Sequence, residues 1–482
     1  MVKVFDADRK LARVLWKRRV KRARAFRLSL LFPGLGQVYQ GRLSAGVAFS
    51  VIGLFPLYYL YLVGKGLNYG TVTLLAAQGL LYGLQALDAK RGASRETSPC
   101  EDRCPASVAV PAFLSFAQEG KIHESYAAFC VKSPFPYILG RLCPAPCESV
   151  CGVLPGRPLK IKELHRRVGE RLLSEVEVVK RSPFFPPAGR KVAVIGGGLA
   201  GITAAYYLAS IGVEVEIFEK EEQLGGLLNY IPDFKLDFEL ARKELKLFTS
   251  FENIKVHLGV EVRSLPENFD AYVVAVGAQV EKSFNPAGYT GSFLTPLKFL
   301  REPPKLKGKR VAVVGAGDTA FDVARLARRL GAEVDVLYRG RRESVKAQEA
   351  EVRAAISEGV NLYTGCEFKG AEGKRLIFSC GSSDYDYLVP AVGFEVDREL
   401  IGGLSSENSF ITGDAATGMT TFIEAVSRAR QTAVAVARKL GLGLRCWFDE
   451  DFYREKPKGA KSCGFICSEA SLCEHCGQSV RS

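Results

Sequence analysis

The chain has 482 residues, which is too long for one ordinary core, so we expect several domains of ~100–200 residues each. Its 66 Lys and Arg residues against 52 Asp and Glu residues give a net charge of +14. Eleven of the basic residues and two Asp lie in residues 1–27, so +9 of the charge belongs to this end. The basic character is local, and we expect no nucleic-acid partner.

Two uncharged segments follow the basic start. Leu43 to Val63 has 21 residues, close to the ~20 that a helix needs to cross a bilayer. Gly70 to Leu87 is a weaker second segment, because it contains Gln78 and Gln85. Basic residues flank the pair on both outer sides, which by the positive-inside rule places both ends in the cytoplasm. A signal peptide or two buried helices are the alternatives, and the first fails because no cleavage site follows.

The stretch FPGLGQVYQGRLSAGVAF, from Phe32 to Phe49, resembles the start of small two-helix membrane domains. The sequence therefore predicts an integral membrane hairpin over residues 28–92, located in the cytoplasmic (inner) membrane with the catalytic domains on the cytoplasmic side.

The thirteen cysteines are grouped. Six lie between Cys100 and Cys151, four lie in the tail, and three are scattered. Grouping of this kind favours metal binding over a secreted disulfide scaffold, because the chain also carries two nucleotide-binding signatures that need an intracellular cofactor supply. We expect reduced thiols. A dithiol outlet for a flavin would need two neighbouring cysteines, and Cys366 and Cys380 are fourteen residues apart.

The first nucleotide-binding signature is KVAVIGGGLAGITAAYYLASIGVEVEIFEK, from Lys191 to Lys220. An apolar strand, a Gly-rich turn, an Ala-rich helix and a second strand follow in order. Glycines at the spacing G-x-G-x-x-G let the backbone approach a pyrophosphate at a helix N-terminus, and Glu219 can accept from ribose hydroxyls. The predicted contacts of this dinucleotide are Gly196, Gly198, Leu199, Ala200, Gly201, Glu219, Lys220 and Gly226.

The second signature is RVAVVGAGDTAFDVARLARRLGAEVDVLYRGRRE, from Arg310 to Glu343. Its second strand ends in arginines instead of an acidic residue. Arginine forks match a 2′-phosphate, which a carboxylate would repel, so this unit predicts NADPH. A solvated basic strand end is the alternative. The predicted contacts are Gly315, Gly317, Asp318, Thr319, Ala320, Arg339, Arg341 and Arg342.

A later segment, SFITGDAATGM, places Gly413 and Asp414 between a short strand and a helical pattern. An acidic side chain here can hydrogen-bond the ribityl or phosphate region of a flavin. The NADPH unit is therefore expected to be inserted within an FAD unit.

From about Pro99 to Leu440 the chain resembles the small subunit of NADPH-dependent glutamate synthase and its relatives. The resemblance rests on CEDRCPASVAVPAF, SPFPYILGRLCPAPCESVCG, LGGLLNYIPDFKLD, GKRVAVVGAGDTAFDVAR, YRGRRE and FITGDAATG. It implies a helical cysteine-rich domain that precedes FAD and NADPH domains of the glutathione-reductase type.

The cysteines before the FAD unit provide an outlet for electrons. Five thiolates are enough for one four-iron cluster, which the resemblance favours over a structural zinc. The predicted ligands are Cys100, Cys104, Cys143, Cys147 and Cys151. The tail offers a second metal site, with zinc and iron–sulfur equally open, formed by Cys463, Cys467, Cys473 and Cys476.

The predicted fold class is α/β, with two Rossmann-like domains, a membrane helical hairpin and a helical iron–sulfur domain. The expected domains are a basic segment (1–27), the hairpin (28–92), the iron–sulfur domain (93–182), the FAD domain in two parts (190–300 and 389–445), the NADPH domain (301–388) and a metal-binding tail (446–482).

The leading functional hypothesis is a membrane-anchored oxidoreductase that passes electrons from NADPH through FAD and iron–sulfur chemistry to a redox partner protein or a quinone. The alternative is an electron-supplying small subunit of a glutamate-synthase-like complex. A redox-sensing protein without turnover is a third possibility, which the intact cofactor residues disfavour. Hydride transfer needs no side-chain acid or base, so no catalytic residue is predicted.

Overall fold

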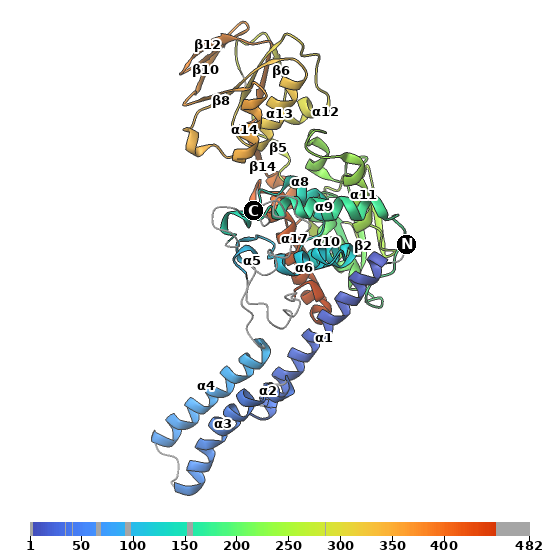
Figure 1. Ribbon diagram of the computed structural model, residues 1–482, viewed down its shortest axis with the longest axis vertical. Coiled ribbons are helices and arrows are strands. Elements are labelled where there is room, and N and C mark those ends of the chain that lie inside the picture. Colours follow the sequence, from blue (N-terminus) through green and yellow to red (C-terminus); the bar gives the residue numbers. More distant parts are fainter. Residues whose placement is uncertain are drawn as a thin grey trace, which may run out of the picture.

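The computed structural model describes residues 3–449, apart from residues 34, 41, 64–68, 92–97, 152–157 and 285. Two parallel sheets and a helical domain form the body, and a helical arm projects from it (Figure 1). The second metal site predicted in the tail, with its four cysteines, lies outside the described residues.

The arm contains α1 (Lys3–Leu31), α2 (Leu35–Tyr39), α3 (Leu43–Val63) and α4 (Tyr69–Arg91). The first turns of α1 lie near the body. The helices α3 and α4 lie side by side in the part of the arm that is farther from the body (Figure 1). Among the helices that the structure describes, none combines the length and the apolar character that crossing a bilayer requires. The predictions of an integral membrane hairpin and of an inner-membrane location are wrong on this finding.

Polar contacts inside the arm give a physical reason for this correction. Gln37 is fully buried, and its Nε2 donates to the carbonyl oxygen of Gln85 at 2.9 Å and to Asp88 Oδ2 at 3.1 Å. Arg42 forms an ion pair with Asp88 at 2.8 Å. An ion pair and a buried amide are costly in hydrocarbon. A count of uncharged residues in the sequence does not reveal these contacts between helices.

The cysteine-rich domain is helical, as predicted. It contains α5 (Pro99–Arg103), α6 (Val110–Gln118), α7 (Ile122–Cys130), α8 (Pro136–Leu142), η1 (Glu148–Val150) and α9 (Ile161–Glu175). Its apolar side chains share one continuous core with the first sheet and its helices. The cysteines are therefore held rigidly relative to the first nucleotide-binding unit.

The first sheet has the strand order β15-β4-β1-β2-β3, and all its pairings are parallel. Its strands are β1 (Lys191–Ile195), β2 (Glu214–Phe218), β3 (Ile254–His257), β4 (Ala271–Val274) and β15 (Ser409–Ile411). The strand β1 is almost wholly buried because helices pack on the sheet. Its main helices are α10 (Leu199–Ser210), α11 (Phe238–Phe248) and α17 (Phe422–Lys439).

The second sheet has the order β6-β13-β7-β8-β9 and is also parallel. Its strands are β6 (Ser292–Phe293), β7 (Arg310–Val314), β8 (Glu333–Tyr338), β9 (Asn361–Thr364) and β13 (Tyr387–Pro390), with the helices α12 (Pro296–Arg301), α13 (Asp318–Arg329) and α14 (Glu349–Ser357). All five strands lie between β4 and β15 of the first sheet in sequence. The prediction of an α/β fold with Rossmann-type units is confirmed.

A small antiparallel sheet is attached to the second sheet. It consists of β10 (Phe368–Glu372), β11 (Arg375–Phe378) and β12 (Gly381–Asp384), with short-range pairings between neighbouring strands. A two-stranded ribbon of β5 (Val280–Glu281) and β14 (Phe394–Glu395) pairs the segments that enter and leave the second sheet. The chain therefore passes between the two units twice, at one place.

Candidate functional site: a flavin pocket beside a cysteine group

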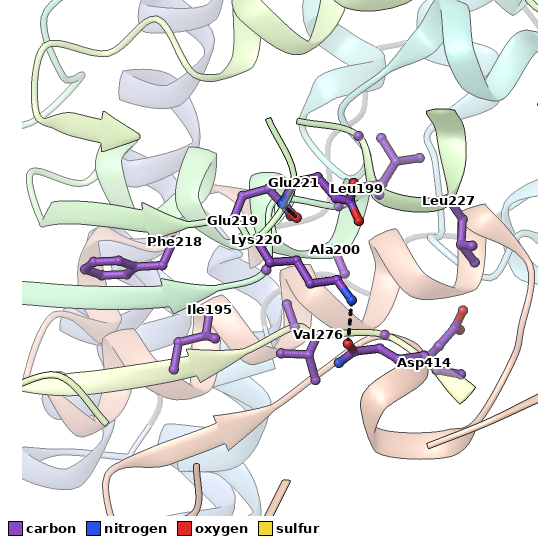
Figure 2. Close-up of a pocket in the computed structure, with 18 of the residues that line it drawn as sticks. Ile195, Leu199, Ala200, Phe218, Glu219, Lys220, Glu221, Leu227, Val276 and Asp414 are labelled. Carbon is purple, nitrogen blue, oxygen red and sulfur yellow. Dashed lines mark hydrogen bonds between the residues drawn. The ribbon is translucent and has the colours of Figure 1, made fainter. Parts of the chain in front are cut away.

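The first Gly-rich turn connects β1 to α10 at the edge of a pocket (Figure 2). Gly196 has a φ of +105°, and a Cβ there would lie 2.4 Å from the carbonyl oxygen of Ala275. A Cβ on Gly201 would lie 1.9 Å from the carbonyl oxygen of Gly196. Both positions therefore require glycine, as close backbone packing at a dinucleotide turn demands.

Glu219 stands at the end of β2, as the sequence predicts. Its Oε2 accepts a 2.6 Å hydrogen bond from the backbone N–H of Gly197, and its Oε1 accepts from the N–H of Glu221 at 2.9 Å. These bonds fix the carboxylate against the Gly-rich turn. On the pocket wall, Lys220 Nζ donates to Oε1 of Gln279 at 3.0 Å, the dashed line in Figure 2.

Asp414 reaches the same pocket from the distant C-terminal part of the chain. It begins the short helix α16 (Asp414–Thr417), and its Oδ1 accepts from Thr420 N–H at 3.0 Å and from Thr420 Oγ1 at 2.7 Å. Burial raises the pKa of this carboxyl above its ordinary value, although the Thr420 bonds oppose the shift. Gly413, with a φ of +62°, faces Ala200, where a Cβ would approach to 2.8 Å.

Most of the residues predicted to contact the first dinucleotide line this pocket. Gly201 lies behind the turn and Gly413 beside Asp414, and neither is part of the lining. The predicted residues that line it are Gly196, Gly198, Leu199, Ala200, Glu219, Lys220, Gly226 and Asp414. No cysteine lines this pocket, so within the described residues there is no dithiol beside the expected flavin position.

The second Gly-rich turn connects β7 to α13. Gly315 has a φ of +127°, and a Cβ there would lie 2.1 Å from the carbonyl oxygen of Ala391. A Cβ on Gly317 would have open space around it. Ala320 is buried in α13, next to Thr319, and Asp318 Oδ1 accepts from the N–H of Gln348 at 3.1 Å.

The three predicted phosphate ligands differ in their surroundings. Arg339 and Arg341 are exposed at the end of β8. Arg342 forms an ion pair with Glu349 at 2.8 Å. The Glu349 carboxylate competes with a phosphate for the Arg342 guanidinium, and Arg339 and Arg341 remain predicted phosphate ligands.

The group of cysteines lies in the helical domain. Burial is the main cause that raises the pKa of the Cys147 thiol, and the neighbouring thiols of Cys104, Cys143 and Cys100 raise it further. Cys143 Sγ accepts from the N–H of Ala145 at 3.3 Å, and Cys151 Sγ accepts from the N–H of Leu159 at 3.5 Å. Backbone donors to sulfur are one of the means by which proteins tune iron–sulfur clusters.

The backbone around these cysteines is strained. Ser107 and Ala145 have φ values of +52° and +54°, which are unusual for residues other than glycine. Both lie within three residues of a predicted ligand. The N–H of Ala145 donates to Cys143 Sγ, whereas the N–H of Ser107 donates to the carbonyl oxygen of Cys104 at 2.9 Å. Among the described residues, no three His, Cys, Asp or Glu side chains converge as ligands of a single ion. A four-iron cluster binds each thiolate at a different iron, whereas a structural zinc needs its four ligands around one ion.

A hydrogen bond joins the segment that follows Cys104 to α17, a helix that also lines the pocket. Ser427 on α17 donates from Oγ to the carbonyl oxygen of Pro105, which follows Cys104, at 2.7 Å. Phe422 and Ala425, from the first turn of the same helix, line the pocket. The helix therefore contacts both sites.

Comparisons with known proteins agree with this geometry. Residues 190–421 match the family model described as pyridine nucleotide-disulphide oxidoreductase. Residues 78–176, which contain all five predicted cluster ligands, match the model described as dihydropyrimidine dehydrogenase domain II, 4Fe-4S cluster. The chain is an oxidoreductase. Its cofactors are FAD, NADPH and a 4Fe–4S cluster, as predicted.

Three curated relatives show how far the similarity extends. The beta subunit of NADP(+)-dependent formate dehydrogenase from Moorella thermoacetica is 31% identical in an alignment that covers 72% of this chain and 60% of that protein. The glutamate synthase [NADPH] small chain of Azospirillum brasilense is 31% identical over 58% of this chain and 63% of that protein. The corresponding small chain of Escherichia coli (strain K12) is 27% identical over 73% of this chain and 88% of that protein. The chain thus spans less than two thirds of the first two relatives.

Sequence reasoning missed two groups that the structure makes prominent. Glu244, on α11, is fully buried against the cysteine-rich domain. Cys366 and Cys380 form a disulfide, contrary to the expectation that all thiols are reduced. The signal for the pair was the strand-rich segment between them, because antiparallel strands bring distant residues together.

Proposed function

We propose that this chain is the electron-supplying subunit of a larger complex, which takes hydride from NADPH and delivers electrons singly to a separate acceptor protein. This is the alternative that the sequence left open, and the named small chains of glutamate synthase among its relatives favour it over a membrane-anchored enzyme. The helix α17 carries the proposed route from flavin to cluster, because Phe422 and Ala425 line the pocket and Ser427 donates to the carbonyl oxygen of Pro105, next to Cys104.

The residues of the chain have separate tasks in this proposal. Arg339 and Arg341 hold the 2′-phosphate and so select NADPH. Glu219 binds ribose hydroxyls of the flavin nucleotide, and Asp414 orients its ribityl or phosphate region. Cys100, Cys104, Cys143 and Cys147 hold the cluster, with Cys151 as the remaining candidate. A flavin supplies the conversion of a two-electron hydride into single electrons.

Two features of the protein assist transfer without a catalytic acid or base. The shared core of the cysteine-rich domain and the first sheet keeps their separation fixed. The unit that binds NADPH is held by ion pairs: Lys235, in the loop before α11, contacts Asp322 of α13 at 2.7 Å and Glu351 of α14 at 3.4 Å. These contacts orient one nucleotide site relative to the other.

A direct test uses the full chain with a ferredoxin as a one-electron protein acceptor. NADPH should reduce the flavin, and the ferredoxin should then be reduced in the wild type but far more slowly in Cys147→Ser. A small dye that takes electrons directly from the flavin should be reduced equally by both proteins. Equal ferredoxin reduction by the two proteins would contradict the proposed route.

A further inference from the structure

The Cys366–Cys380 disulfide lies in the unit of the second sheet, far from the cysteine group. Cys366 follows β9 and is 2% exposed, whereas Cys380 is exposed in the turn between β11 and β12. In Figure 1 the small sheet containing β10 and β12 lies at the outer end of the molecule, away from α17. Neither cysteine lines the flavin pocket, so the pair has no place in the route from flavin to cluster.

The segment that contains Cys366 supports the loop that presents Arg339. The N–H of Cys366 donates to the carbonyl oxygen of Tyr338 at 2.9 Å, and the N–H of Gly365 donates to the carbonyl oxygen of Gly340 at 2.8 Å. These two acceptors are the residues immediately before and after Arg339. Two backbone hydrogen bonds therefore fix the arginine from both sides.

Ser379, next to Cys380, completes the connection on the other side of the disulfide. Its Oγ donates to the carbonyl oxygen of Gly365 at 3.0 Å and accepts from the N–H of Glu367 at 2.9 Å, and its own N–H donates to the carbonyl oxygen of Glu367 at 2.8 Å. The disulfide is the covalent bond that holds these weaker contacts in register. Without it, the turn is held to the Arg339 loop by exposed hydrogen bonds, which contribute little each.

The charges near the loop are balanced. Lys369 Nζ donates to Oε2 of Glu367 at 2.5 Å. This bond, and to a smaller extent the charge of Arg339, lowers the pKa of the Glu367 carboxyl. The Glu367 carboxylate thus has an ion pair with Lys369. The disulfide therefore affects the position of Arg339 and not its charge.

We propose that Cys366 and Cys380 form a second redox site in this chain, a thiol–disulfide pair that a dithiol reductant of the thioredoxin class reduces, with weaker binding of the 2′-phosphate as the consequence. The inference rests on the proposed assignment of NADPH to Arg339. An arginine whose backbone is held in place binds a phosphate at a lower ordering cost, and release of the turn raises that cost.

The dithiol reductant supplies the electrons and protons of the redox step. One thiolate of the dithiol attacks the exposed Sγ of Cys380, the S–S bond breaks, and Cys366 leaves as a thiolate that takes up a proton. The second thiol of the reductant resolves the mixed disulfide. Two electrons and two protons pass to the protein, which becomes a dithiol while the reductant becomes a disulfide.

The test compares 2′,5′-ADP with 5′-AMP as probes, because they differ only in the 2′-phosphate. Binding to the full chain is measured by calorimetry in the oxidised protein, after reduction by thioredoxin, and in Cys380→Ser. Ser382→Ala, on β12 of the same small sheet, is the matched control. Alkylation and mass spectrometry before and after reduction count the thiols at the two positions.

Reduction and Cys380→Ser should each weaken 2′,5′-ADP about fivefold or more, the lower end of usual coupling between sites, and should leave 5′-AMP and the control unchanged. Equal 2′,5′-ADP affinity in both redox states would overturn the inference while leaving the NADPH assignment intact. No preference for 2′,5′-ADP in the oxidised protein would instead refute that assignment. Alkylation of both cysteines without reductant would show that the disulfide does not form.

Discussion

Tyr126 Oη donates a 2.8 Å hydrogen bond to Oε1 of Glu244, a carboxyl that is fully buried. The same carboxyl accepts from the backbone N–H groups of Tyr137 and Ile138, both at 2.9 Å. Glu244 belongs to α11 of the first unit, and its three donors belong to the cysteine-rich domain. One side chain thus holds the start of α8 and a tyrosine of α7 against the flavin unit.

Replacing Glu244 by Ala should lower the free energy of unfolding by about 3 kcal/mol, because buried donors lose their acceptor. Glu239→Ala, an exposed change on the same helix, is the control and should have little effect. Chemical denaturation of the two variants measures the difference. Equal stability would show that Glu244 is not the connection described.

The pH dependence of stability provides a second test of this carboxyl. Burial raises the pKa of Glu244 to about 7 in the folded protein, above the ~4.3 of an unfolded glutamate. The folded state therefore binds more protons between these values, and the contribution of Glu244 to stability should fall as pH rises from about 4.3 to about 7, by at most about 1.4 kcal/mol per pH unit. Denaturation midpoints across this range should show a slope that Glu244→Ala lacks.

Ser427→Ala removes the hydrogen bond to Pro105. We expect a loss of about 1 kcal/mol in stability and slower transfer from flavin to cluster, with the rate of flavin reduction by NADPH unchanged. Stopped-flow absorbance separates the two steps. Gln431→Ala, at an exposed position of α17, is the control and should alter neither rate. A flavin-to-cluster rate that is identical in Ser427→Ala would remove this contact from the route.

Arg339→Ala should weaken NADPH binding about tenfold or more, since hydrogen bonds to charged groups contribute about 1.5–3 kcal/mol, and should spare NADH. Arg342→Ala is the informative comparison, because Glu349 already holds that guanidinium. Its effect on NADPH should be smaller. Titrations with both nucleotides measure the preference, and equal flavin reduction by NADPH and NADH in the wild type would contradict the assignment.

The sequence predicts the nucleotide-binding units well because their signals are local. The Gly-rich turn, the helix after it and Glu219 lie within about thirty residues, in the βαβ unit that this spacing requires. Asp414 comes from a distant segment, and the short strand and the helix expected around it are present as β15 and α17. Backbone geometry at Gly196 and Gly315 then supports both turns.

Long-range contacts explain what the sequence could not predict. Glu244 looks like an ordinary helical glutamate, and only the approach of α7 and α8 gives it partners. Cys366 and Cys380 meet because of the pairing of the small sheet. The uncharged segment from Leu43 to Val63 suggested a membrane span because composition does not show the buried polar contacts of Gln37 with α4.

The central claim is that the cysteine group holds a four-iron cluster that receives electrons from the flavin. Iron and acid-labile sulfide per flavin, with electron paramagnetic resonance after NADPH addition, should be measured in the full chain, in Cys147→Ser and in the control Cys130→Ala. The wild type and the control should contain iron and sulfide and give a reduced-cluster signal, whereas Cys147→Ser should lose most of both and keep its flavin. Zinc in place of iron, or an unchanged signal in Cys147→Ser, would contradict the account.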